Sequence, residues 1–323
     1  VVQSEVPSQR DSDFPTIVES AVPTAISDGC AENSNAFNMC LSFSPTLTST
    51  DISVINQAAS RWESIIIGDL QDLNVGVGNV PSVDCEFVPD FKDGIVDDID
   101  VCITISSTRP GFGAVSGVLA SAGPVWFTSD TSRAVWGLMW IDQADVNNLR
   151  NDLDAYYDVI VHEFGHILGI GTLWENTGLT DSDSCTSYDA GTKAAAFYEQ
   201  ISGCAPGEKL IPVEGNCGHW SESCFKNELM TPTLTSGTRT KLSSLTVASL
   251  EDLGYEVSYN SVDEFTSDDI DADCRCSNRR SLRGETRNAN RHQRKLEIIS
   301  AEKAMAIAHG EEMLQDEGTQ DQW

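Results

Sequence analysis

Apolar residues recur at helical spacing in two long segments of the chain. The first segment, residues 51–67, predicts a helix whose apolar side chains share one face: Ile52, Ile55, Ala59, Trp62 and Ile66. Thr50 or Asp51 is placed to cap its start, and Gly68 follows its end.

The second segment predicts a helix over about 152–168. Its buried face is expected to hold Leu153, Tyr156, Ile160, Phe164 and Ile167. Asn151 or Asp152 can cap its start, and Gly169 is placed to end it. Shorter helices are predicted over 192–201 and 246–253.

Strand-like patterns lie between the two long helices. Residues 101–105 alternate apolar and polar, and 124–128 and 135–141 are rich in β-branched and aromatic residues. A helix, several strands and a second helix together predict a mixed α+β domain. Residues 1–28 are polar and lack periodicity, and 277–323 read as a mobile tail.

Composition narrows the class of protein. The net charge is −30, and the basic residues concentrate in 275–295, which carry eight of them and one acid. An acidic body argues against nucleic-acid binding. The acidity is interpreted as a source of solubility, with cationic substrates or surface Ca²⁺ sites as alternatives. No apolar run reaches the ~20 residues of a membrane-spanning helix.

Ten cysteines are scattered along the chain rather than grouped in CxxC pairs. An even, scattered set favours disulfides over a thiolate metal site, and disulfides indicate an oxidising compartment. We therefore expect a secreted or extracellular protein, and an extracellular protein can also be associated with the cell surface. No oligomeric state is predicted.

The strongest chemical signal is the run His162-Glu163-Phe164-Gly165-His166 within the second long helix. Residues four apart lie one above the other on a helix, so both imidazoles can bind one zinc ion. Glu163 lies beside the same site without being a ligand. It is therefore the predicted general base toward a zinc-activated water, and it can pass the proton to the leaving amine.

A catalytic zinc site needs a third protein ligand. The chain has five histidines, and two of them, His292 and His309, lie in the predicted tail. His219 is therefore the main candidate, and the carboxylates of Glu175 and Glu222 remain alternatives.

At this point the sequence resembles a known family. The run from His162 to Gly169 is similar to the start of the metzincin signature, in which a third His usually follows the Gly by three residues. Thr172 occupies that position here. In this departure the sequence resembles leishmanolysin-like peptidases, in which an insertion precedes the third His. His219 then matches the third ligand, and Met230 in Asn227–Pro232 matches the family's Met-turn beneath the zinc.

The resemblance covers about 41–265 and implies a metzincin-like α+β fold. An upper part, about 41–169, would hold a mixed twisted sheet and two long helices. A lower part, about 170–265, would be mostly irregular or helical, with a substrate cleft between the two. Residues 1–40 would form a flexible arm or propeptide remnant. Residues 266–323 would form a Cys-containing and then basic, mostly disordered tail.

The predicted function is that of a zinc-dependent endopeptidase that acts on proteins or peptides. His162, His166 and His219 would bind the metal, Glu163 would act as the base and Met230 would support the site. The alternatives are an inactive leishmanolysin-like module for extracellular adhesion or binding, and a zinc hydrolase of non-peptide amides. Relatives are latent precursors, some held by a propeptide Cys. Cys30 and Cys40 are candidates for that role, although a disulfide between them is the favoured interpretation.

Overall fold

The structure is a computed structural model that describes residues 36–74, 95–96, 98–115, 117–128, 131–180, 185–215, 217–276 and 293–298. Its helices are α1 (Ser49–Glu63), α2 (Val146–Arg150), α3 (Leu153–Ile167), α4 (Lys193–Ser202), α5 (Glu222–Phe225) and α6 (Ser244–Asp252), with short 3-10 turns at η1 (Ser267–Asp269) and η2 (Ala272–Cys274). Its strands are β1 (Met39–Phe43), β2 (Leu73–Asn74), β3 (Ile95–Val96), β4 (Ile99–Ser106), β5 (Val118–Phe127), β6 (Ala134–Asp142), β7 (Ser187–Tyr188), β8 (Ile211–Pro212), β9 (Thr233–Thr235) and β10 (Gln293–Ile298).

The main sheet has six strands in the order β1-β4-β6-β5-β10-β9. Strands β1, β4 and β6 run parallel, and β5 is antiparallel to β6. β10 is parallel to β5 and antiparallel to β9. Two small pairs, β2–β3 and β7–β8, lie outside this sheet. The mixed sheet and the two 15-residue helices α1 and α3 confirm the predicted α+β class.

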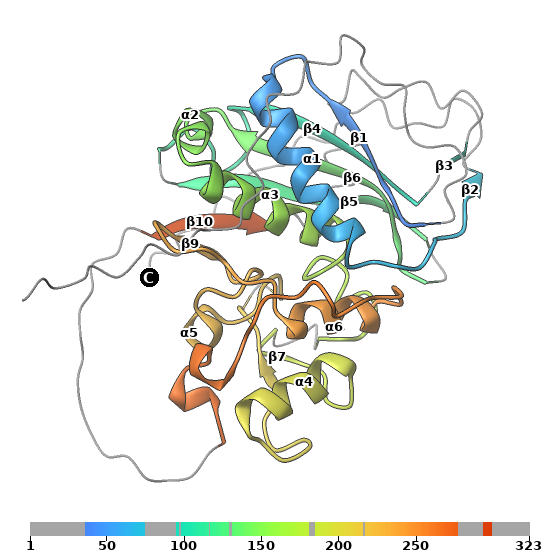
Figure 1. Cartoon of the computed structure of the whole chain (residues 1–323), viewed down its shortest axis with the longest axis vertical. Helices are drawn as coiled ribbons and strands as arrows, with labels where there is room; N and C mark the ends of the chain where they lie inside the picture. The colour runs from blue at the N-terminus through green and yellow to red at the C-terminus, as the bar shows by residue number, and fades with distance from the viewer. Residues whose placement is uncertain are drawn as a thin grey trace, which may run out of the picture.

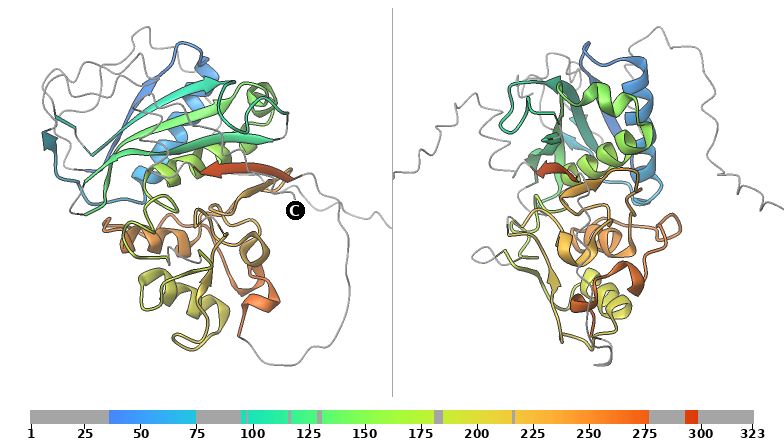
Figure 2. Two further views of the ribbon diagram at one scale, coloured as in Figure 1. Left: turned by 180° about the vertical axis from the view of Figure 1, so that it is seen from behind. Right: turned by 90° about the vertical axis from the view of Figure 1, so that its left-hand side faces the viewer.

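Helices α1 and α3 lie on the same face of the sheet, as the two views of Figure 2 show. The indole of Trp62 on α1 donates a hydrogen bond to the Val161 carbonyl of α3 at 2.9 Å. Against the sheet, a Cβ on Gly137 of β6 would lie 2.5 Å from the Ile167 side chain. Gly137 therefore allows the end of α3 to pack directly on the sheet.

The start of α1 differs from the prediction. Thr48 is the N-cap, and Asp51 is the third helical residue and closes a capping box with Thr48. The predicted caps, Thr50 and Asp51, therefore lie inside the helix, which ends at Glu63, before Gly68. The start of α3 agrees with one of the two predicted caps, because the Asp152 side chain accepts a hydrogen bond from the Ala155 N–H.

Apart from β9 and β10, which join the main sheet, the described chain that follows α3 forms the lower part of the molecule in Figure 1, with α4, α5, α6 and the β7–β8 pair. Three disulfides hold it: Cys185–Cys217, Cys204–Cys276 and Cys224–Cys274. They confirm that the scattered cysteines form disulfides. Cys40 and Cys102 are also disulfide-bonded, whereas Cys30 lies outside the described residues, and the predicted Cys30–Cys40 pair with it.

Strand β10 lies in the segment 277–323, where the sequence predicts no strand. Its residues form a polar, basic hexapeptide, but ladder hydrogen bonds use backbone groups that any sequence possesses. The rest of that segment and residues 1–35 lie outside the described residues. Within the described part of the chain, the helices are too short or too polar to cross a bilayer.

Candidate metal centre

Helix α3 places His162 and His166 one above the other on its buried side. Both side chains are completely buried, although neither belongs to the buried face that the apolar spacing predicts. Their ring centroids are 4.6 Å apart. The two Nε2 atoms are separated by 2.9 Å, so the one-turn spacing brings both nitrogens to a single point.

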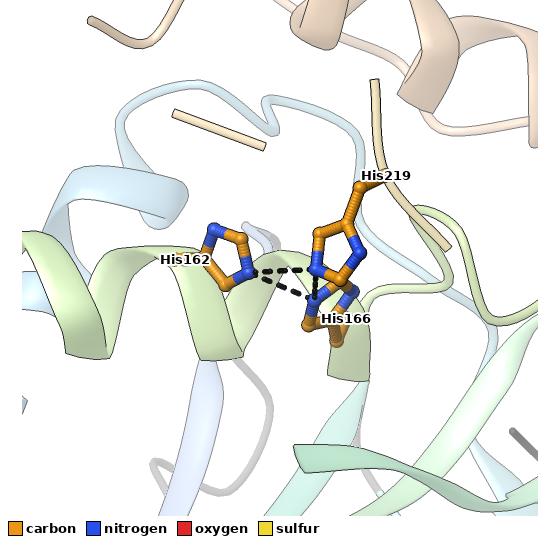
Figure 3. Close-up of side chains that lie close together, drawn as sticks. All are labelled: His162, His166 and His219. Atoms are coloured by element: carbon orange, nitrogen blue, oxygen red, sulfur yellow. Dashed lines mark hydrogen bonds between the residues drawn. The ribbon is translucent and has the colours of Figure 1, made fainter. Parts of the chain in front are cut away.

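His219 reaches the same point from the lower part of the chain. Its Nε2 atom lies 3.3 Å from that of His162 and 3.1 Å from that of His166 (Figure 3). Its backbone carbonyl accepts a hydrogen bond from the Glu214 N–H at 2.9 Å. Two residues earlier, Cys217 is bonded to Cys185, so the loop that carries this ring is anchored on both sides.

Backbone carbonyls orient two of the three rings. Nδ1 of His162 lies 2.6 Å from the Leu229 carbonyl oxygen, and Nδ1 of His166 lies 2.9 Å from that of Ile170. A carbonyl only accepts, so each Nδ1 must carry the proton, and each Nε2 presents a lone pair. This is the arrangement that orients a metal-binding histidine.

The three Nε2 atoms fit one metal ion. Ligand atoms around a tetrahedral zinc ion lie about 3.3 Å from one another, and the distances here are 2.9–3.3 Å. Lone pairs of His162 and His166 that face each other at this separation repel unless a cation lies between them. Among the described residues, these histidines form the group of side chains that could hold a metal.

Burial also sets the charge state of the rings. Desolvation lowers the pKa of His162 to about 4, against a weaker opposing effect of its hydrogen bond to Leu229. The pKa of His166 is likewise well below its ordinary value, mainly because of burial. Both imidazoles are therefore neutral near pH 7, which is the form that binds a metal.

The other predicted site residues are placed as follows. Glu163 is completely buried, beside His162 on α3. Met230 is buried against the same helix, because a Cβ on Gly165 would lie 2.7 Å from its sulfur atom. The alternative third ligands are elsewhere: Glu175 is exposed, Glu222 is half-buried, and neither belongs to the metal-binding group.

Some supporting residues gave no sequence signal. The carbonyls of Leu229 and Ile170 act through the backbone, so no side-chain motif could have revealed them. Thr172 stands where most metzincins carry the third His, and here its hydroxyl donates to the His166 carbonyl at 2.6 Å. The threonine thus supports the turn after α3, and the third imidazole of the group comes from His219.

The comparison with known families agrees with this geometry. The matching family model is that of leishmanolysin, and it covers residues 88–282, more than half of the chain. The chain therefore belongs to the leishmanolysin family, which is a family of zinc-dependent metallopeptidases. No curated protein matches the chain.

Proposed function

We propose that this protein is a zinc-dependent endopeptidase whose metal ligands are His162, His166 and His219. The observation that carries the proposal is the convergence of three buried Nε2 atoms within 3.3 Å of one another. Three neutral imidazoles are a common donor set for catalytic zinc. Bound there, zinc lowers the pKa of a coordinated water to about 7 and polarises a carbonyl group.

Glu163 is the proposed general base and acid. It is adjacent in sequence to one ligand and precedes the other by three residues, so α3 holds all three side chains at one place. Its carboxylate takes the proton from the attacking water and donates it to the amine of the leaving peptide. Met230 packs against Gly165 and thereby supports the same stretch of α3.

The proposed domain organisation places catalysis in residues 41–265. The upper part, to residue 169, supplies α3, and the lower part, from 170, supplies His219 and Met230. A protein or peptide substrate would lie in extended form between the two parts, paired with a sheet edge. Three disulfides support secretion as the proposed location. A bound Ca²⁺ ion stays a proposal without a defined site.

The test is casein cleavage by wild type, Glu163→Gln and His219→Ala, with zinc content measured by mass spectrometry. We expect cleavage that a chelator blocks, a loss of at least about 100-fold in Glu163→Gln with zinc retained, and loss of zinc in His219→Ala. Glu175→Gln is the matched control, because it removes an exposed carboxylate and should cleave normally.

Two outcomes would favour other functions. Zinc binding without cleavage of casein or of any peptide library would contradict the proposal and favour an inactive module for adhesion or binding. Cleavage restricted to small non-peptide amides would instead favour a different zinc hydrolase.

A further inference from the structure

Glu228 is a completely buried carboxylate that lies outside the group of histidines. Its Oε2 atom accepts a hydrogen bond from the Met230 N–H at 2.6 Å. Its Oε1 atom accepts from the Ser243 hydroxyl at 2.6 Å, from the Ser243 N–H at 3.3 Å and from the Thr246 hydroxyl. Burial of a carboxylate is unfavourable unless donors surround it, and here every donor comes from the Met-turn or from the start of α6.

One connection leads from Glu228 to His162. The hydrogen bond to Met230 closes a tight turn around Leu229, and the Leu229 carbonyl is the group that accepts from Nδ1 of His162 at 2.6 Å. Leu229 is held from its other side as well, because its N–H donates to the Lys241 carbonyl at 2.8 Å. The carboxylate therefore fixes the carbonyl that orients the first ring.

A second connection leads from Glu228 to the chain beside His219. The Thr246 hydroxyl donates to Glu228 and accepts from the indole N–H of Trp220 at 2.8 Å. The backbone N–H of Trp220 also donates to the Met230 carbonyl at 3.0 Å. Trp220 is completely buried and directly follows the third ligand, so this path holds the loop that presents it.

We propose that Glu228 is a positioning residue of the metal centre, which orients His162 through Leu229 and His219 through Thr246 and Trp220. The proposal rests on the proposed metal site. In this role, one carboxylate orients two proposed ligands, one from the upper part of the fold and one from the lower part. Groups that orient ligands from outside typically change metal affinity by about 10–100-fold when they are removed.

A purely structural carboxylate would behave differently. Glu228 would then tie the Met-turn to the N-cap Ser243 of α6 and contribute to folding stability alone. Its removal would lower Tm, but the folded protein would bind zinc as tightly as wild type does. Metal affinity measured on folded protein therefore separates the two roles.

The decisive variant is Glu228→Gln in the full chain. Gln has the same shape but presents an NH₂ group to an N–H or O–H donor in either orientation, so at least one of the hydrogen bonds must break. Asp98→Asn is the matched control. Asp98 is also buried and accepts from the Asn38 and Leu70 N–H groups, away from the three histidines.

Zinc affinity is measured by competition with a chelator at a temperature where circular dichroism shows each variant folded. Cobalt substitution supplies a second readout, because its visible bands report ligand geometry. We expect Glu228→Gln to bind zinc about 10–100-fold more weakly and to shift the cobalt bands. Asp98→Asn should match wild type in both measurements.

Folded Glu228→Gln with wild-type zinc affinity and an unchanged cobalt spectrum would overturn the proposal. If Glu228→Gln does not fold, Thr246→Val tests the proposal instead, because it removes the hydroxyl that links Glu228 to Trp220 with little change in volume. Weaker zinc binding by Thr246→Val supports the proposal, and unchanged binding overturns it. If the wild-type protein binds no zinc, the proposed function itself is wrong, so the two failures are distinguishable.

Discussion

Gly171 and Gly218 are in direct backbone contact, since a Cβ on Gly171 would lie 1.9 Å from the Gly218 carbonyl oxygen. Gly171 belongs to the turn that follows α3, and Gly218 directly precedes His219. The approach of these two glycines therefore brings His219, the proposed third ligand, beside the helix that holds the other two histidines. The backbone of Gly171 also has a φ of 76°, which side-chain-bearing residues rarely adopt.

Gly171→Ala should displace the loop of His219 and weaken zinc binding. We expect a loss of about 2–4 kcal/mol in the free energy of unfolding and a zinc affinity at least about 10-fold lower. Gly178→Ala is the control, because Gly178 has a φ of 72° but open space around it. It carries the same backbone strain without the clash, so its zinc affinity should stay at the wild-type value. Equal affinities of the two variants, measured by chelator competition, would contradict the prediction.

Gly165→Ala should crowd Met230 against α3. The added methyl group would lie 2.7 Å from the Met230 sulfur, and overpacking of this kind costs about 1–3 kcal/mol. Met230→Ala makes room, so the double variant should be more stable than the sum of the two single losses predicts. Urea unfolding of the four proteins measures this coupling. Additive losses would show that the two side chains do not meet.

Metal removal should lower the melting temperature. A ligand that binds only the folded state contributes about 4 kcal/mol at a concentration 1,000 times its Kd. With an unfolding entropy of about 2.1 cal/mol/K per residue, this amounts to a Tm shift of roughly 6 °C for a chain of 323 residues on addition of a chelator. His219→Ala should show little of the shift, whereas Glu175→Gln should show all of it. A full shift in His219→Ala would exclude that ring as a ligand.

Arg150→Met should destabilise the protein mainly at neutral pH. Asp51 is completely buried, and its Oδ2 atom lies 2.6 Å from Arg150 Nη2. Burial alone would raise the pKa of Asp51, but hydrogen bonds from Arg150 and Thr48 outweigh it and lower the pKa below its ordinary value. A carboxyl with a lowered pKa stabilises the fold above about pH 4, and this contribution is lost as pH falls through the folded pKa.

We therefore expect Arg150→Met to lower the free energy of unfolding by about 3–5 kcal/mol at pH 7 and by clearly less at pH 3, measured by urea unfolding. Arg61→Met is the control, since Arg61 pairs with the more exposed Asp263 and should cost under about 1 kcal/mol. A loss of equal size at both pH values would show that Arg150 acts through packing instead of charge.

The sequence predicted the elements whose signal lies in side-chain spacing. Helix α3 is the best case, because its apolar positions and its two histidines follow one helical period, and its N-cap Asp152 is one of the two predicted caps. The cap of α1 was wrong because Thr48 and Asp51 form a reciprocal pair. Spacing from the apolar residues alone cannot tell which polar residue of such a pair lies outside the helix.

The proposed third ligand shows the limit of local patterns. His219 lies far along the chain from α3, and the residues alone left Glu175 and Glu222 as alternatives. The structure excludes these two carboxylates from the group because tertiary packing, through the Gly171–Gly218 contact, determines which side chain arrives. The carbonyl of Leu229 is a backbone group, so side-chain spacing contains no information about it.

The backbone of β10 occupies the edge of β5 that β6 leaves open, with register partners at Val118, Ser121 and Ala122. On its other side β10 pairs with β9 through residues 233–235, directly after the Met-turn. An extended peptide that adds to this edge of β5 needs the same row of N–H and C=O groups. If a peptide substrate pairs with this edge, as the proposed function requires, strand β10 has to leave it first, and the apparent affinity for the peptide falls with the fraction of molecules in which the edge is free.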